Sequence, residues 1–262
     1  MTGNKYFNMI VLGLKEQLIY VRAMLFRQFL MVTIMIIFVN LWSVVYQGQT
    51  EINGHSYNQV IWYLLITEAF FMSRAPVAYK IADEIKNGTF AYTSSRPYSY
   101  ALYHFFVSLG DSSFKLLTNF IVGAVLVMLL GIKLNISFLA ILCFFLVMLI
   151  GYIIDYCLQF MIGTFSFIQE EISGYVFIYE KLLFIFGGII FPLSILSNHV
   201  EQLFFLMPFV YVIGFPAQLL TQGLSELNIL YLGLQLLYLM IFIISAKACY
   251  TSLRKKTMMN GG

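Results

Sequence analysis

Long uninterrupted apolar stretches constrain this chain more than any other feature of its sequence. A helix needs about 20 apolar residues to cross the roughly 30 Å of a bilayer's hydrocarbon core. Six stretches qualify, at residues 29–47, 57–75, 103–131, 138–165, 176–196 and 228–250. The fifth is the weakest, because Glu180 and Lys181 shorten its apolar run. These runs are too long for the strands of a barrel, so we expect an all-α membrane protein with six transmembrane helices.

The overall composition agrees with a membrane protein. The 262 residues are 61% hydrophobic and 10% charged, whereas soluble domains are about one-quarter charged. The three cysteines and three histidines show no metal-ligand or catalytic spacing. We therefore expect no metal site and no catalytic centre in this chain, and no binding to nucleic acid.

The positive charges predict which loops face the cytoplasm. Twelve of the 15 Lys and Arg residues precede the first apolar stretch, follow the second, or end the chain, and Lys133 alone lies in the opposite set of loops. Cytoplasmic loops carry an excess of Lys and Arg. Both termini are therefore predicted to be cytoplasmic, as an even number of spans requires.

One further apolar segment tests this count. Residues 200–221, "VEQLFFLMPFVYVIGFPAQLLT", contain Pro208 and Pro216, which should divide a helix into pieces too short to cross. A seventh crossing would also place the terminal basic cluster outside. We expect residues 197–226 to form short re-entrant helices at the outer face, over the mouth of a pathway.

The residues before the first apolar stretch form an amphipathic pattern. Phe7, Val11, Leu14, Leu18 and Leu25 recur at helical spacing among basic residues. This pattern predicts, over residues 1–28, a helix that lies in the inner membrane interface beside anionic lipid headgroups. The alternative is a simple extension of the first span.

Residues 76–99 are charged and are punctuated by Gly and Pro between two apolar stretches. Val77, Ile81 and Ile85 repeat every four residues, which predicts that a helix continues past the membrane. Gly88 is a plausible stop for that helix, because Gly adopts the left-handed conformation without a Cβ penalty. Pro97 could open the next helix. The connection at Gln169-Glu170-Glu171 could offer a second cytoplasmic contact.

Two segments resemble the permease subunits of ABC type-2 exporters, in particular the drug and peptide efflux group that includes daunorubicin-type permeases. "DEIKNGTFAYTSSRPYS" (83–99) is similar to that family's segment after span two, and "FPLSILSNHVEQLFFLMPFVYVIGFPAQLLTQG" (191–223) to its outer-loop pattern. The resemblance implies an elbow helix before span one. It also implies a coupling helix that docks on a cytoplasmic ATPase, with outer helices that contain Pro208 and Pro216 as a gate. The residues assigned to ATPase coupling are Asp83, Glu84, Ile85, Lys86, Gly88, Glu170 and Glu171.

The same resemblance implies partners. The chain has no Walker A sequence, so ATP and Mg²⁺ would be bound by a separate ABC ATPase subunit. A second permease, identical or paralogous, would complete the pore in a bacterial plasma membrane. The expected function is ATP-driven export of an amphiphilic drug, peptide or lipid-like substrate by a non-catalytic permease.

Two acids lie inside apolar stretches, Glu68 in the second and Asp155 in the fourth. Ionised acids in a membrane interior are costly, so such residues are functional candidates. They could contact a cationic substrate, pair with Lys115, Arg74 or a neighbouring subunit, or carry protons. The alternative function is accordingly an ion-coupled secondary transporter or channel that uses Glu68 and Asp155.

Overall fold

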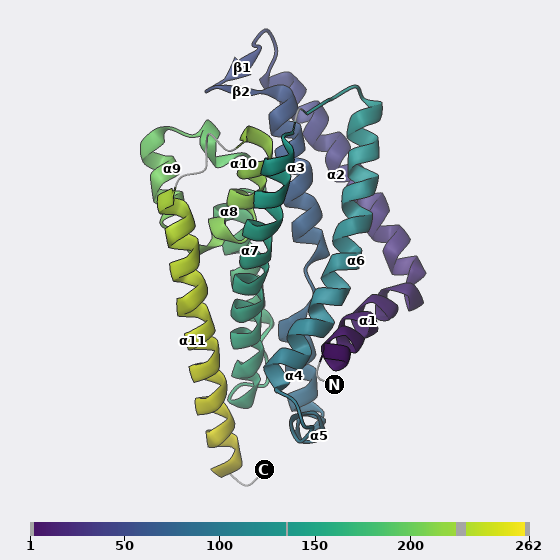
Figure 1. Ribbon diagram of the computed structural model, residues 1–262, viewed down its shortest axis with the longest axis vertical. Helices are drawn as coiled ribbons and strands as arrows, with labels where there is room; N and C mark the ends of the chain where they lie inside the picture. Colours follow the sequence, from purple (N-terminus) through teal and green to yellow (C-terminus); the bar gives the residue numbers. More distant parts are fainter. Residues whose placement is uncertain (1–2, 135, 224–228, 260–262) are drawn as a thin grey trace.

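The computed structural model describes residues 3–134, 136–223 and 229–259, and they form an elongated bundle of helices (Figure 1). Within these residues, five helical segments are long and apolar enough to cross a membrane. They are α2 (Val21–Val45), α3 (Tyr57–Ser73) with its continuation α4 (Val77–Lys86), α6 (Tyr100–Leu129), α7 (Phe138–Thr164) and α11 (Ile229–Met259). These helices confirm the prediction of an all-α membrane protein, but not the predicted number of six spans.

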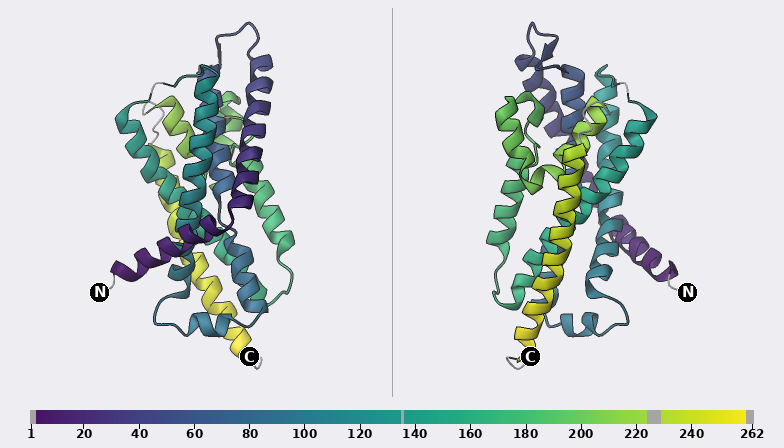
Figure 2. Two further views of the ribbon diagram at one scale, coloured as in Figure 1. Left: turned by 90° about the vertical axis from the view of Figure 1, so that its right-hand side faces the viewer. Right: turned by 60° about the vertical axis from the view of Figure 1, so that its left-hand side comes forward.

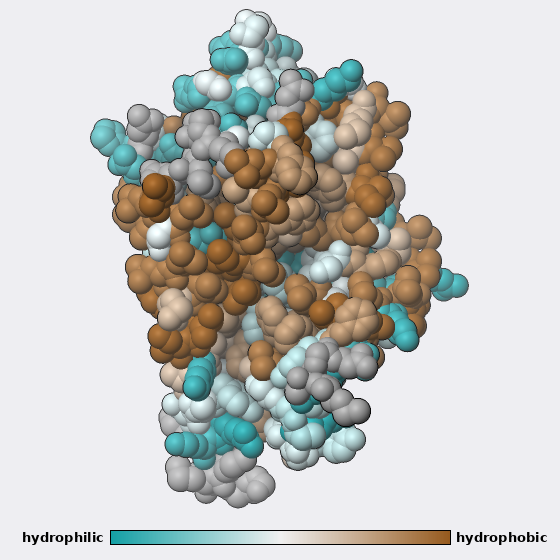
Figure 3. Space-filling view, in the orientation of Figure 1, coloured by the Kyte–Doolittle hydropathy of each residue, from teal (hydrophilic) through white to brown (hydrophobic). Residues whose placement is uncertain are grey.

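The surface agrees with a position in a bilayer. Figure 3 shows a band of apolar side chains across the middle of the face in view, with hydrophilic residues gathered at its two ends. The N- and C-terminal ends of the chain lie in the half of the molecule opposite the β-hairpin (Figure 1). A bilayer solvates such a band with its hydrocarbon and leaves the two polar ends in water.

The expected helix over residues 176–196 is shorter than predicted. Helix α8 (Ser173–Phe186) has 14 residues, which corresponds to about 21 Å at 1.5 Å per residue. Gly188 has a φ of +74°, and Pro192 precedes the short turn η2 (Leu193–Ile195). A left-handed glycine followed by a proline stops a helix, so this stretch is not one continuous spanning helix.

The expected interfacial helix also ends earlier than predicted. Helix α1 (Gly3–Ile19) stops at Tyr20, and residues 21–28 already belong to α2. Helix α1 crosses α6 closely, because a Cβ at Gly13 would lie 2.0 Å from the Val107 carbonyl oxygen, and one at Gly110 would lie 2.0 Å from the Ile10 carbonyl oxygen. Figure 2 shows α1 projecting from the side of the bundle.

The opposite end of the bundle carries a hairpin and three short helices. Strands β1 (Glu51–Ile52) and β2 (His55–Ser56) pair antiparallel. Asn53 and Gly54 connect them with φ of 49° and 79°, as a type I′ turn requires. Sequence reasoning missed this hairpin, although Asn-Gly is its usual signal.

The predicted outer segment contains α9 (Asn198–Phe205), η3 (Pro208–Tyr211) and α10 (Gly214–Gln222), and its last residues, 224–226, lie outside the described part. Pro208 begins η3 and separates it from α9, as expected. Pro216 instead lies in the first turn of α10 and does not divide that helix, because the N–H groups of a first turn have no partner within the helix. Gly151 lets η3 approach α7, since a Cβ there would lie 2.6 Å from the Tyr211 carbonyl oxygen.

Candidate functional site

The candidate site is centred on residues 74–76, which interrupt the helix between α3 and α4 and which we call the break. Pro76 has no N–H and disfavours a helical conformation in the residue before it. The N–H groups of the residues on either side of it therefore do not make the hydrogen bonds of a regular α-helix. The N–H of Ala75 donates to the Ser112 hydroxyl of α6 at 3.0 Å, and the N–H of Val77 donates to Gln159 Oε1 of α7 at 3.0 Å. Side chains from two neighbouring helices therefore complete the hydrogen bonding of the break.

Asp155 and Arg74 form a buried pair at the same place. Asp155 is 1% exposed, and its Oδ1 lies 2.8 Å from Nε of Arg74. The Tyr179 hydroxyl of α8 donates to the same oxygen, and Gln159 Nε2 donates to Oδ2 at 2.7 Å. The Arg74 guanidinium also lies over the rings of Phe71 and Tyr179, 5.7 Å and 5.0 Å from their centroids. This node joins α3, α7 and α8.

The two intramembrane acids do not form a common site. Asp155 pairs with Arg74, one of the partners that the sequence offered for it, and its contact with a substrate or with protons stays a prediction. Lys115 pairs with Asp111 at 2.9 Å instead of with Asp155 or Glu68. Glu68 is 5% exposed, and within the described residues its carboxyl group makes no hydrogen bond or ion pair. Contact of Glu68 with a substrate stays a prediction.

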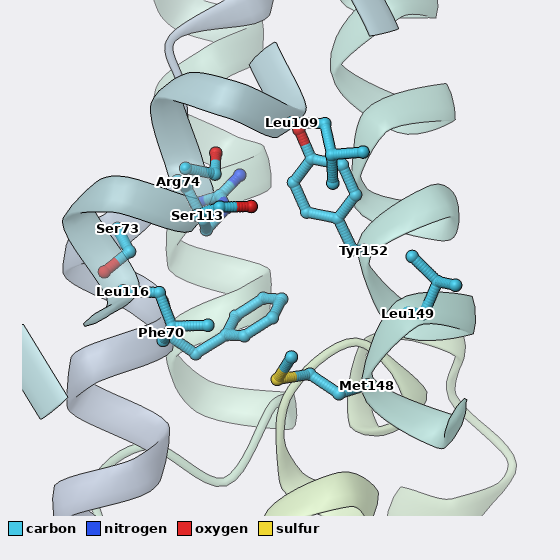
Figure 4. Close-up of a pocket in the computed structure, with 10 residues that line it drawn as sticks. Phe70, Ser73, Arg74, Leu109, Ser113, Leu116, Met148, Leu149 and Tyr152 are labelled. Carbon is cyan, nitrogen blue, oxygen red and sulfur yellow. The ribbon is translucent and has the colours of Figure 1, made fainter. Parts of the chain in front are cut away.

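Two cavities flank the break, and Arg74 lines both. The smaller, of about 60 Å³, lies between α3, α6 and α7; Phe70, Leu116, Met148 and Tyr152 surround it (Figure 4). The larger, of about 170 Å³, lies between the break, α7 and α8 and is lined by both apolar and polar side chains. The break is thus less tightly packed than the close helix contacts at Gly13 and Gly151.

Helix α4 has the amphipathic form that the sequence predicts, and it ends where expected. Gly88 follows it with a φ of +72°. Its buried face carries Val77, Ala78, Ile81 and Ala82. Asp83, Lys86 and Gly88 are exposed, and Ile85 is half-buried. The prediction that Pro97 opens the next helix is wrong. A short helix, α5 (Phe90–Ser94), comes before Pro97, and α6 begins only at Tyr100, after the N-cap Ser99.

Glu84 differs from its neighbours because it points into the protein. Its Oε2 accepts hydrogen bonds from the Thr93 and Tyr100 hydroxyl groups, each at 2.9 Å, and lies 3.4 Å from Nε2 of His104. Glu84 therefore connects α4 to α5 and α6. This inward orientation suits a role in fixing residues 87–99 better than the predicted contact with an ATPase.

Glu170 and Glu171 lie in the connection beside α4. Glu171 Oε2 is 4.0 Å from Lys86 Nζ, and Ile172 packs on Ala78 and Ala82 below it. The Ser173 N–H donates to the Glu171 carboxylate at 3.0 Å, and this bond together with Lys86 lowers the pKa of Glu171. The structure therefore brings the two predicted cytoplasmic contacts together into one surface, which we call the α4 surface: Asp83, Lys86, Gly88, Glu170 and Glu171.

Sequence reasoning missed the residues that tie this surface to the rest of the chain. Lys80 of α4 pairs with Glu16 of α1 at 2.8 Å, and Lys5 Nζ donates to the Pro97 carbonyl oxygen at 3.4 Å. Ser112 and Gln159 are the side chains that complete the break. A polar residue inside an apolar run, such as Gln159, was the signal that could have indicated a buried partner.

Comparison with known proteins identifies the family. No curated protein matches the chain. A family model described as "ABC-2 family transporter protein" matches residues 29–258, which is most of the chain. The chain therefore belongs to the ABC-2 transporter family, whose members are in general the non-catalytic membrane component of ABC transporters and work with ATPase subunits.

Proposed function

We propose that this chain is the membrane-spanning subunit of an ATP-driven exporter and that a separate ATPase docks on the α4 surface. The observation that carries the proposal is the meeting of α4 with the Glu170–Glu171 connection, which are distant in sequence and joined at Lys86 and Glu171. Exposed charges of both signs on one compact surface suit recognition by a soluble partner.

The α4 surface has a mechanical connection to the membrane-embedded helices. Movement of α4 would act first on the break at Ala75 and Pro76, whose N–H partners Ser112 and Gln159 belong to α6 and α7. The Arg74–Asp155 pair would carry the same movement to α7 and, through Tyr179, to α8. Discrete rearrangement of a packed hinge is a known way to convert a local event into a change of access.

In this proposal the chain crosses the membrane six times. Helix α8 with residues 187–197, an irregular stretch that contains the short η2, forms the fifth crossing, because irregular backbone is tolerated where protein surrounds it. Gly187 and Gly188 are buried, which supports that view. Both termini and the α4 surface then face the cytoplasm of a bacterial cell, and α9, η3 and α10 cover the outer end. A second permease, identical or paralogous, completes the pathway for an amphiphilic substrate.

Purification of the chain from cells that also express its neighbouring genes tests the proposal. We expect a stoichiometric ATPase to co-purify in mild detergent, and ATP hydrolysis to accompany it. Asp83→Lys combined with Glu171→Lys should abolish this association. Glu51→Lys, an exposed acid on β1 at the opposite end, is the matched control and should not. A chain that purifies alone and transports without nucleotide would contradict the proposal and favour ion coupling through Glu68.

A further inference from the structure

The 170 Å³ cavity beside the α3–α4 break carries a charge that the coupling mechanism does not use. Eleven residues line it, and Arg74 and Glu180 are the two that carry charge. Arg74 already donates to Asp155 and lies over two aromatic rings. Glu180 is half-buried, and its carboxylate makes no hydrogen bond or ion pair with the described residues. It lies within electrostatic reach of Arg74.

The sum of these charges is negative. Arg74 and Asp155 cancel as a pair, so Glu180 leaves the cavity with an unbalanced negative charge. An anion would have to displace Asp155 from Arg74 to gain a partner, and this would leave the Asp155 carboxylate buried without its counter-ion. A cation would instead find a free carboxylate. The cavity therefore favours cations over anions.

The size and the lining of the cavity narrow the class of ligand further. A cavity of about 150 Å³ is large enough for a benzene molecule, so about 170 Å³ accommodates a trimethylammonium group or one ring. Tyr79 and Tyr179 contribute aromatic rings, and Ile162 and Val176 contribute apolar surface. Aromatic rings attract quaternary ammonium groups through their π faces, and the Glu180 carboxylate supplies a counter-charge.

We propose that this cavity binds an organic monocation, with Glu180 as its counter-ion and with an apolar or aromatic group against Tyr79 and Val176. The assignment deepens the proposed export function, on which its role in transport rests. Ala75 and Pro76 form part of the cavity wall, so a bound cation would lie against the break itself. Ligand occupancy would therefore influence the conformation that the coupling helix transmits.

Binding of tetramethylammonium to the purified full-length chain in detergent, measured by isothermal titration calorimetry, tests the proposal. tert-Butanol is its neutral isostere, and methanesulfonate is an anion of similar size. We expect the cation to bind at least tenfold more tightly than either. Glu180→Gln should weaken cation binding at least tenfold, whereas Glu180→Asp should retain most of it. Glu51→Gln makes the same change at the other end of the molecule and should have no effect.

Equal binding of the neutral isostere, preference for the anion, or unchanged affinity in Glu180→Gln would overturn the assignment. Absence of cation binding to a monodisperse wild-type chain would overturn it as well. The titration requires no ATPase, so it separates the two proposals. Cation binding by a chain that recruits no ATPase would refute the exporter and leave the cavity assignment standing, and the reverse result would refute the cavity alone.

Discussion

Asp155 of α7 and Arg74 at the end of α3 form an ion pair of 2.8 Å with side chains that are 2% and 9% exposed. Two charges removed from water stabilise a fold only when both are present, because the survivor of a single substitution stays buried without a partner. Here the partners also lie beside the break that separates α3 from α4, the segment proposed to couple to the ATPase. Loss of either charge should therefore affect both stability and coupling.

We predict that Asp155→Asn destabilises the chain by about 3–5 kcal/mol, because it leaves the Arg74 guanidinium buried and unpaired. The effect is measured as the loss of the folded, monodisperse peak in size-exclusion chromatography after the protein is heated in detergent to a series of temperatures. The matched control is the double variant Arg74→Met with Asp155→Leu, which removes both charges and should be more stable than Asp155→Asn. An Asp155→Asn variant as stable as the wild type would show that the pair contributes little.

The Glu84 carboxylate should control the order of the loop after α4. Glu84→Gln keeps the size of the side chain but weakens the bonds from Thr93 and Tyr100, and hydrogen bonds to a charged group contribute about 1.5–3 kcal/mol each. We expect amide hydrogen exchange in residues 87–99 to accelerate at least tenfold, since about 1.4 kcal/mol corresponds to a factor of ten.

The neighbouring Asp83→Asn is the control for that measurement. Asp83 is exposed, so its substitution should leave exchange in residues 87–99 unchanged while it alters the α4 surface. If both variants accelerate exchange equally, Glu84 has no special role in the loop. If only Asp83→Asn weakens binding of the ATPase, the two adjacent acids serve different purposes, as their orientations indicate.

The contrast between Asp83 and Glu84 shows which features the sequence predicts and which it does not. The spacing of Val77, Ile81 and Ile85 predicts α4 correctly, and Gly88 ends it, because both signals are local. The inward direction of Glu84 depends on Tyr100 folding back beside it, which no local pattern encodes. Likewise, the acidic residue at position 155 indicated a buried partner, but three candidates remained until packing selected Arg74.

The boundary between α1 and α2 was missed for a similar reason. Apolar residues repeat at helical spacing on both sides of Tyr20, and residues 14–28 contain no Gly or Pro, so a continuous helix was the simplest interpretation. The break depends on the contact of α1 with α6, where Gly13 and Gly110 permit a close crossing. Single glycines inside helices usually lower helix stability, so their presence in two helices was a signal of close packing.

Gly13 should therefore be intolerant of any side chain. A Cβ there would lie 2.0 Å from the Val107 carbonyl oxygen and 2.8 Å from the Asp111 backbone nitrogen, and backbone atoms cannot move aside as a side chain can. We expect Gly13→Ala to separate α1 from α6 and to destabilise the chain by about 1–3 kcal/mol. Gly233→Ala in α11 is the control, because a Cβ there meets nothing within 4 Å. Equal unfolding temperatures for the two variants would contradict the prediction.

Lys86 and Glu171 should matter for association with the ATPase and hardly at all for stability. The pair is exposed and 4.0 Å apart, and such pairs contribute about 0–1 kcal/mol. Reversal of both charges, Lys86→Glu with Glu171→Lys, should cost no more stability than the lost bond from the Ser173 N–H to Glu171. The rate of ATPase association should fall and its dependence on salt should change, because exposed charges steer encounter. Stopped-flow or surface-based association rates at several salt concentrations measure this.

The pH dependence of that rate provides a second test of the same pair. The Ser173 N–H and Lys86 lower the pKa of Glu171, so its carboxylate stays charged to a lower pH than an ordinary glutamate, whose pKa is about 4.3. Its contribution is complete above that value and is lost only as the pH falls through the lowered pKa. The wild-type salt dependence should therefore be constant between about pH 5 and pH 8. A change of the salt dependence within this range, absent from the Glu171→Gln variant, would show that Glu171 is not held in its charged form by these two neighbours.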